Sequence, residues 1–217
     1  MSYDTAVPRA EERERNTAQI LGQVMFLVAV AIGFLVAGTA TGRELPDGTA
    51  TICTFAGLGM LIVTWFVDAL RHGSLGIGWL CGLSLLIGLG LGPTIGYLAE
   101  TNPGQITTAA GITALTVLGM AAIGFVIDKD TAGWMRPLSF VVLGAVAISL
   151  GALIFGGLGS LSPLVSAVIL VASALLILVD FNYIRKHATE DDAVWLATGI
   201  FVSIVNIFLS LLNLTSD

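Results

Sequence analysis

The chain has 217 residues, of which 56% are hydrophobic and only 11% are charged, and its mean hydropathy is +0.94. A soluble domain carries about 25% charged residues, so this composition excludes a soluble globular protein and indicates an integral membrane protein. The formal net charge is −6, and no basic patch is interleaved with aromatic residues, so we expect no nucleic-acid partner.

The N-terminal segment is polar up to the point where the first long apolar run begins. Residues 1–19 carry Arg9, Arg13 and Arg15, and they lack the short apolar core and cleavage pattern of a signal peptide. We therefore expect residues 1–19 to form a cytoplasmic tail and residues 20–217 to form a single membrane domain.

Seven segments are long and apolar enough to cross a bilayer, which takes about 20 residues of helix. In chain order they are Ile20–Ala40, Thr51–Leu70, Leu75–Leu98, Ile106–Ile127, Leu138–Phe155, Leu161–Val179 and Ala193–Leu212. The connections are short, and turn residues such as Pro46-Asp47-Gly48 mark some of them. The sequence therefore predicts an all-α integral membrane protein built as a bundle of seven transmembrane helices in contact with the lipid bilayer.

The positions of Lys and Arg predict how this bundle is oriented. Eight of the nine lie in the N-terminal tail or in the connections after the second, fourth and sixth segments: Arg9, Arg13, Arg15, Arg71, Lys129, Arg136, Arg185 and Lys186. Only Arg43 lies on the other side. Because cytoplasmic loops carry the excess of Lys and Arg, we expect the N-terminus in the cytoplasm and the C-terminus outside.

The third segment contains an unusual run in which Gly88, Gly90 and Gly92 alternate with leucine just before Pro93. Small residues let helices approach closely in lipid, and this explains most of the membrane glycines. Alternate glycines followed by proline also weaken a helix, so we expect a kink here. A broken helix at membrane depth must be covered by protein or line a water-filled cavity. The kink is therefore a candidate gate as well as a packing element.

Polar residues follow one face of the seventh segment. Gly199, Ser203, Asn206, Ser210 and Asn213 are separated by four, three, four and three residues, which places them on a single side of a helix. A continuous polar stripe is unfavourable against lipid, so we expect it to face the interior of the bundle. There it would either join helices by hydrogen bonds or line a polar path.

Asp180 follows the apolar run of the sixth segment, at the edge of the hydrocarbon. A carboxylate at this depth is unfavourable unless it is paired, hydrated or protonated, which makes it a candidate functional residue. We expect it to contact the stripe near Ser203 or to pair with Arg71, and the simpler alternative is hydration at the membrane surface. Arg71 also has a local partner in Asp68, three residues before it.

The other acidic residues fit connections between helices. Asp128 and Asp130 flank Lys129, and we expect both carboxylates to be solvated. Thr189, followed by Asp191 and Asp192, resembles the start of a helix.

The chain also lacks the motifs of common membrane enzymes and pigments. No lysine lies in a predicted span, which excludes a retinal Schiff base, and there is no His-Glu-x-x-His zinc motif. We expect no enzymatic activity, no cofactor and no resident metal, although Asp180 is a possible contact for a calcium ion in transit.

Three stretches of the chain are similar to the transmembrane Bax inhibitor motif family, also known as the Bax inhibitor-1-like family. They are Leu-Val-Asp-Phe-Asn-Tyr-Ile at 178–184, Gly-Ile-Phe-Val-Ser-Ile-Val-Asn-Ile-Phe-Leu-Ser-Leu-Leu at 199–212, and Gly-Leu-Gly-Leu-Gly-Pro-Thr-Ile-Gly-Tyr at 88–97. With the seven spans and the short tail, the resemblance covers nearly the whole chain. It implies a seven-helix bundle with the last helix at its centre.

The resemblance also implies a site. Calcium-leak members of the family have an aspartate pair that shares a proton, one from the sixth helix and one from the seventh, with an arginine of the second helix as a latch. Asp180 matches the first aspartate, Arg71 is in the place of the latch, and Ser203 stands where the second aspartate would be. Because a serine carries no charge, this departure argues against a two-carboxylate pH sensor.

A serine at this place resembles the bacterial YccA-like branch, whose members associate with the membrane protease FtsH and modulate it. Two functions are therefore implied. The first is a calcium or other cation leak channel, with Asp180, Ser203, Asn206 and Arg71 in ion conduction and pH sensing. The second is a regulatory protein that binds an FtsH-like protease. Either one would lie in the bacterial inner membrane.

Overall fold

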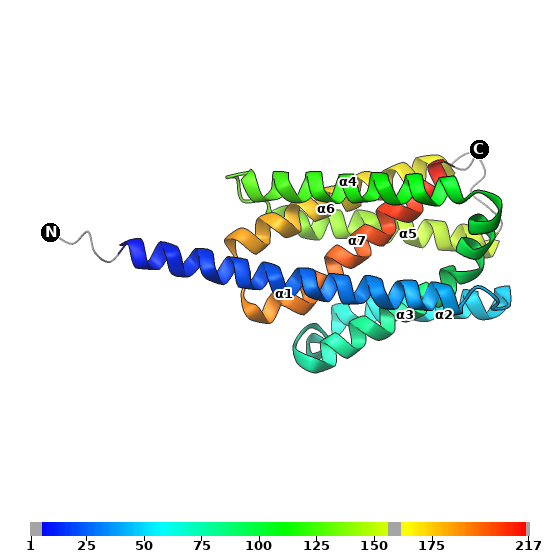
Figure 1. Ribbon diagram of the computed structural model, residues 1–217, viewed down its shortest axis with the longest axis horizontal. Helices are drawn as coiled ribbons and strands as arrows, with labels where there is room; N and C mark the ends of the chain where they lie inside the picture. The colour runs from blue at the N-terminus through cyan, green and yellow to red at the C-terminus, as the bar shows by residue number, and fades with distance from the viewer. Residues whose placement is uncertain (1–5, 156–161, 216–217) are drawn as a thin grey trace.

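The computed structural model describes the backbone of residues 6–155 and 162–215, and within them the side chains of residues 16–149, 151 and 162–215. Every regular element in these ranges is a helix (Figure 1). The long helices are α1 (Ala6–Thr41), α2 (Asp47–Phe66), α3 (Gly73–Thr101), α4 (Pro103–Val126), α5 (Met135–Phe155), α6 (Ser162–Lys186) and α7 (Ala193–Leu214). Short 3₁₀ helices lie in three connections: η1 (Asp68–Arg71), η2 (Ala132–Trp134) and η4 (Glu190–Asp192).

All seven long helices of the described chain are apolar enough to span a bilayer, which confirms the predicted architecture. Several boundaries differ from the prediction, and three of the differences bear on the polar residues near the helix ends. Helix α1 begins at Ala6, inside the segment expected to be a tail, and α2 ends at Phe66, before Asp68. Helix α6 continues past Val179 to Lys186, because the polar side chains after Val179 find partners or cover inside the protein. Asp180 therefore lies within a helix rather than at its end.

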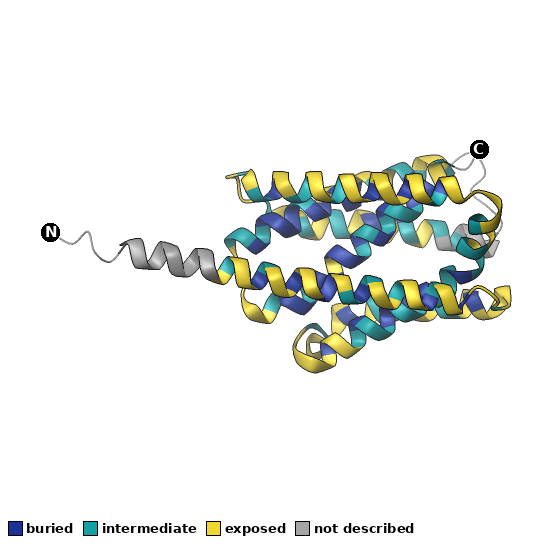
Figure 2. Cartoon of the chain, viewed as in Figure 1, coloured by how far each residue is buried: buried dark blue, intermediate teal, exposed yellow. Residues whose placement is uncertain are grey.

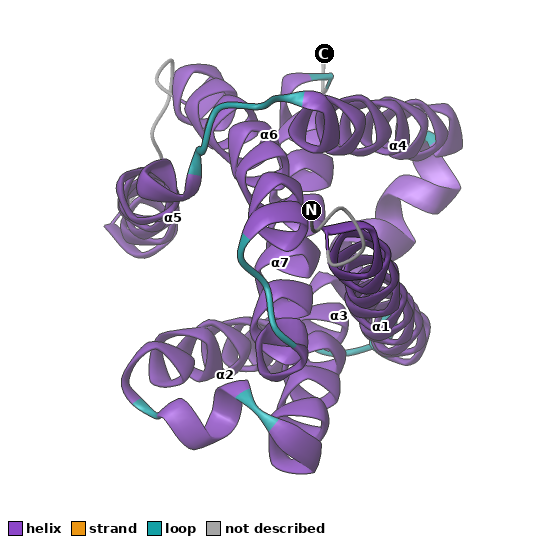
Figure 3. Cartoon of the chain, turned by 90° about the vertical axis from the view of Figure 1, so that its left-hand side faces the viewer, coloured by secondary structure: helices purple, strands orange, loops and turns teal. Residues whose placement is uncertain are grey.

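Helix α7 lies at the centre of the bundle (Figure 3) and packs against α1, α3, α4 and α6. It is enclosed on several faces. Ser203 of the polar stripe is 2% exposed, and Phe201, two residues before it, is 0% exposed. The last helix is thus the core of the protein, as the family resemblance implied.

Helices α2 and α5 lie at the periphery (Figure 3). Apart from its contact with η1, α2 packs mainly against α3, and α5 packs mainly against α6 and η2. Large apolar side chains point outward from the outer helices, for example Phe66 at 82% exposed and Leu115 at 73% exposed. Figure 2 shows this exposed shell around the buried centre. This distribution is expected for a bundle whose solvent is lipid.

Three of the connections lie together at one end of the bundle. The α2–α3 connection meets the α6–α7 connection through His72 Nδ1 and the Asp191 carbonyl oxygen, 2.7 Å apart. The α4–α5 connection meets the end of α6 through Asp130 Oδ2 and His187 Nε2, also 2.7 Å apart. The C-terminal end of α7 lies at the opposite end of the bundle (Figure 1). The connections predicted to share the Lys- and Arg-rich side therefore lie on one side of the molecule.

Candidate functional site: a polar seam between α6 and α7

Asp180 is buried between α6 and α7, with 5% of its surface exposed. Its carboxylate lies against Gly199 of α7, since a Cβ placed on Gly199 would be 3.6 Å from Asp180 Oδ2. The expected contact with the polar stripe is therefore present, at the glycine one helical turn before Ser203. The alternative, a carboxylate hydrated at the membrane surface, does not fit this burial.

The carboxylate of Asp180 has no hydrogen bond or ion pair within the described residues. Arg71 does not supply one. Its guanidinium lies 3.1 Å from Asp68 Oδ1, and its Nε donates to the Thr64 carbonyl oxygen at 2.8 Å. The local Asp68 pair is thus confirmed, and the predicted pairing of Arg71 with Asp180 is not present. Arg71 does not pair with Asp180 because carbonyl oxygens at the end of α2, which lack partners within the helix, accept hydrogen bonds from its guanidinium.

The stripe on α7 runs from Asp180 to the far end of α6. Ser203 and Ser210 are 2% and 4% exposed, whereas Asn206 is half-buried. Asn213 is exposed, but its side-chain nitrogen donates to Ser162 Oγ at 2.9 Å and to Ser166 Oγ at 2.7 Å. The prediction that the stripe faces other helices holds for the serines and, through these bonds, for Asn213.

Ser173 of α6 belongs to the same interface, although sequence reasoning missed it. Its Oγ is buried and has no hydrogen-bond partner within the described residues. Asp180–Gly199 and Ser166–Asn213 fix one antiparallel register, which places Ser173 at the level of Asn206. The signal was present, because Ser166, Ser173 and Asp180 are seven residues apart and so share one helix face.

These residues form a band of polar groups along the α6–α7 interface, which we call the polar seam. It consists of Ser166, Ser173 and Asp180 on α6 and Ser203, Asn206, Ser210 and Asn213 on α7. The seam offers one carboxylate among neutral hydroxyl groups and two amides. Within the described residues, no three His, Cys, Asp or Glu side chains gather as they would around a metal ion. The seam is therefore suited to brief contacts with a cation, because firm Ca²⁺ binding takes six to eight oxygens.

The glycine-proline element of α3 does not break the helix, which runs from Gly73 to Thr101 through Pro93. The alternate glycines instead let two neighbouring helices, α1 and α2, approach α3 closely. A Cβ on Gly88 would lie 2.2 Å from the Leu35 carbonyl oxygen of α1, and one on Gly90 would lie 2.1 Å from Thr54 Oγ1 of α2. Helix α3 is therefore continuous through this run, and close packing of three helices accounts for the glycines, while a kink or gate at this place stays a prediction.

Pro93 removes one hydrogen-bond donor from α3. Neighbouring backbone packs against the carbonyl oxygen that is left without its usual donor. Proline has no N–H, so the Leu89 carbonyl oxygen loses its usual partner four residues on. That oxygen faces Gly42, the residue that follows α1, where a Cβ would lie 2.6 Å away. Gly92 meets the same glycine, since a Cβ there would be 2.3 Å from the Gly42 carbonyl carbon. Neighbouring backbone in this position is what lets proline persist inside a membrane helix.

Near the seam, α6 also holds the end of α4. Asn182 is 0% exposed, and its Nδ2 donates to the carbonyl oxygens of Gly124 and Ile127 at 3.2 and 3.0 Å. Its Oδ1 accepts from the backbone N–H and the hydroxyl of Thr131 at 3.1 and 3.0 Å. Arg185 donates to the Ile127 carbonyl oxygen at 2.6 Å. These bonds cap α4 from another helix, a role that nothing in the local sequence of Asn182 indicates.

The acidic residues of the α4–α5 connection contact basic side chains, whereas we expected solvated carboxylates. Asp128 Oδ1 lies 3.5 Å from Arg185, and Asp130 contacts His187, although both carboxylates keep substantial exposure. At the next connection, Thr189 and Asp192 form reciprocal side-chain to backbone hydrogen bonds at the start of η4. The expected helix-start chemistry is therefore confirmed, one short 3₁₀ turn before α7.

The Asp130 carboxylate gives a pH prediction. Its pKa is held below the ordinary value, first by the hydrogen bond from the Ala132 backbone N–H and next by the bond to His187. A depressed folded-state pKa adds stability above the unfolded-state pKa of about 3.9, and this stability is lost as the pH falls through the folded-state pKa. We therefore expect Asp130→Asn to lower the thermal midpoint at pH 7, and we expect this difference to disappear only as the pH falls through the lowered pKa of Asp130. A difference that persists below that pKa would contradict this role.

Comparison with known proteins gives a family and several bacterial relatives. Residues 14–217 match the model of the family described as inhibitor of apoptosis-promoting Bax1. The chain is 30% identical to an uncharacterized protein of Pseudomonas aeruginosa, over 94% of this chain and 92% of that one. It is 28% identical to the modulator of FtsH protease YccA of Escherichia coli, over 92% and 90%. A Neisseria meningitidis protein is 28% identical over 69% and 66%.

Proposed function

Since this chain belongs to the Bax inhibitor family of integral membrane proteins, we propose that it is a cation leak channel, for calcium or another small cation, that uses Asp180. The observation that supports this most is a buried carboxylate without a partner among the described residues. An ionisable group inside a membrane bundle is energetically unfavourable without a counter-charge. Its presence there therefore points to a functional role. No catalytic step is part of the proposal.

The polar seam offers such a cation a succession of contacts. Asp180 lies six residues, or about 9 Å of helix, before the end of α6 at Lys186. Ser173 and Asn206 follow at the next level, and Asn213 with Ser166 lies at the far end. The polar groups therefore extend along most of the thickness that an ion has to cross. Weak contacts at several levels suit conduction, because an ion must leave each one.

The leak is tested with purified protein in liposomes that contain a calcium-sensitive or a pH-sensitive dye. We expect a slow flux down an imposed gradient that is absent from protein-free liposomes. Equal dye signals with and without protein, for both ions and between pH 5 and 8, would exclude the channel function.

Orientation is part of the proposal. We place the end that carries Arg71, Arg136 and Arg185 in the cytoplasm and the C-terminus outside, in the bacterial inner membrane. A C-terminal alkaline phosphatase fusion, which is active only outside the cytoplasm, should be active. A C-terminal green fluorescent protein fusion should stay dark. The opposite pattern would reverse the proposed topology.

Regulation of a membrane protease is a second candidate, favoured by the similarity to the FtsH modulator YccA over 92% of the chain. We expect cross-linking in native membranes to capture an FtsH-like protease. We also expect its turnover of a membrane substrate to change at least about twofold, ~0.4 kcal/mol in rate terms, when this protein is deleted. An unchanged turnover rate with no captured protease would rule this candidate out.

A further inference from the structure

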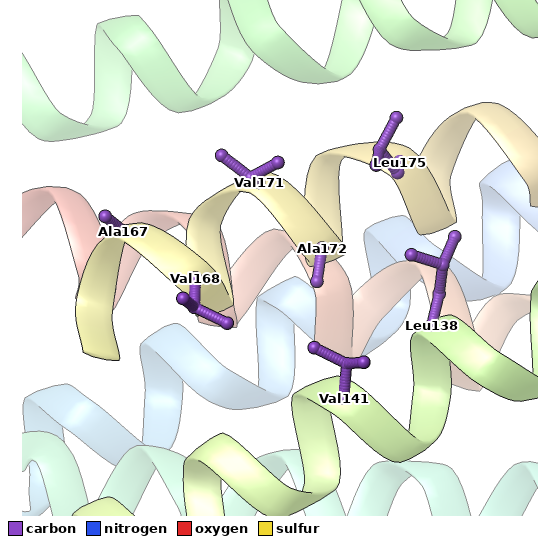
Figure 4. A pocket seen from close by; sticks show the side chains of 7 residues that line it. All are labelled: Leu138, Val141, Ala167, Val168, Val171, Ala172 and Leu175. Atoms are coloured by element: carbon purple, nitrogen blue, oxygen red, sulfur yellow. The ribbon is translucent and has the colours of Figure 1, made fainter. Parts of the chain in front are cut away.

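The clearest surface feature away from the polar seam is a groove between α5 and α6. Two adjoining hollows of about 420 and 340 Å³ lie between these helices and share Val141 and Val168. Figure 4 shows the first, with Leu138 and Val141 of α5 facing α6. The second carries the groove on to Ile148. Every residue that lines either hollow is apolar. We call the two together the α5–α6 groove.

The groove opens to the bilayer. Leu164 and Val171 on its α6 wall are 62% and 56% exposed. On the α5 wall, Gly144 contributes no side chain, and a Cβ there would meet nothing within 4 Å. Gly144 therefore leaves part of the space between α5 and α6 unfilled.

Arg136 lies one helical turn before Phe140 of the groove. Arg136, Phe140 and Gly144 are four residues apart in α5 and so share one face, and the last two line the groove. Arg136 is exposed and makes no hydrogen bond or ion pair within the described residues. Trp134, just before it, is 61% exposed, which is typical of a side chain at the membrane surface.

We propose that the α5–α6 groove binds an anionic phospholipid, with its phosphate at Arg136 and one acyl chain along Val141, Gly144 and Val168. The unpaired guanidinium matches an anionic headgroup, which binds at basic sites on the Lys- and Arg-rich side of a membrane protein. The walls are mainly valine and leucine, whereas a partner's transmembrane helix favours small residues along its contact. A flexible methylene chain fits such walls better than a helix does.

Lipid retention tests the proposal. The full-length protein is placed in nanodiscs of equal parts phosphatidylglycerol and phosphatidylcholine, and retained lipids are counted by native mass spectrometry. We expect wild type to keep phosphatidylglycerol about fivefold over phosphatidylcholine. Arg136→Gln should remove this preference, and Gly144→Leu should lower retention of both lipids. Gly111→Leu is the control, because its Cβ also meets nothing within 4 Å but it lies outside the groove, on α4.

The measurements distinguish a change in lipid binding from misfolding of the variant. Both glycine variants are checked for unchanged helix content and elution volume before lipids are counted. Wild-type retention in Gly144→Leu, or an unchanged preference in Arg136→Gln, would overturn the proposal. So would loss of a co-purifying membrane protein in Gly144→Leu without loss of lipid, because a helix would then occupy the groove.

Discussion

Asp180→Asn is expected to lower cation flux through the protein at least about tenfold, which corresponds to ~1.4 kcal/mol on the barrier. Asparagine has nearly the same shape as aspartate, so the contact with Gly199 of α7 is kept. What is lost is the negative charge and the ability to take up and release a proton. A neutral amide cannot offset the unfavourable free energy of a cation at membrane depth. Flux is measured in liposomes at matched protein content.

Asp68→Asn is the matched control for this change. It also removes one carboxylate near the Lys- and Arg-rich end, but Asp68 is 86% exposed and pairs with Arg71 rather than facing the seam. We expect its flux to be close to wild type. An equal loss in both variants would mean that surface charge controls the flux. Wild-type flux in Asp180→Asn would leave protease regulation as the remaining function.

A second carboxylate in the seam should change how the leak responds to pH. Ser203 is buried and lies one turn beyond Gly199, so Ser203→Asp would place a carboxyl group beside Asp180. Two interacting carboxyl groups titrate in coupled steps, and flux should then depend more steeply on pH than in wild type. Ser210→Asp, about two turns farther along α7, should not produce this change. Removing Asp180 from the double-carboxylate variant should abolish the steep dependence.

Gly88→Val is expected to have the largest effect on folding. Its Cβ would lie 2.2 Å from the Leu35 carbonyl oxygen and 3.0 Å from the Thr39 nitrogen, both backbone atoms of α1. Backbone cannot move aside as a side chain can, so α1 and α3 must separate. Overpacking of this kind destabilises by about 3 kcal/mol or more, which for a protein of this size lowers the thermal midpoint by roughly 10 °C.

Gly78→Val provides the comparison in the same helix. Gly78 is exposed, and a Cβ there would meet nothing within 4 Å. The two variants share the same change in helix propensity, so their difference isolates the α1–α3 contact. We expect Gly78→Val to keep a midpoint close to wild type and a single symmetric elution peak. Equal midpoints in the two variants would show that α1 and α3 do not approach closely at Gly88.

The helices and the interior position of α7 follow from patterns that a single sequence contains. Apolar length identifies a span, and the spacing of Ser203, Asn206 and Ser210 identifies a buried face, because lipid penalises polar groups wherever the chain folds. The contact between Asp180 and α7 was predictable for the same reason. The extent of α6 was not, since the helix continues past Val179 only because α7 and the end of α4 receive its polar side chains.

Pairings between distant segments were the least predictable part of the site. Arg71 had two carboxylates within conceivable reach, and the outcome was decided by the free carbonyls at the end of α2. Asn182 looks like any polar residue near a membrane surface until α4 is placed beside it. The close packing at the alternate glycines could be recognised only once α1 and α2 were placed beside them. Each of these outcomes depends on a neighbour that local sequence does not identify.

The central position of α7 has a consequence for how the protein is made. Translation delivers α7 after the other six long helices of the described chain, so those six spans are made before the helix at their centre. We therefore expect the bundle to complete its packing only after α7 has been inserted, although assembly of a chain generally begins during its synthesis. A premature stop codon before Ala193 would remove the centre of the bundle rather than its edge. We expect quality-control proteases to degrade the truncated chain, so that protein without α7 does not accumulate.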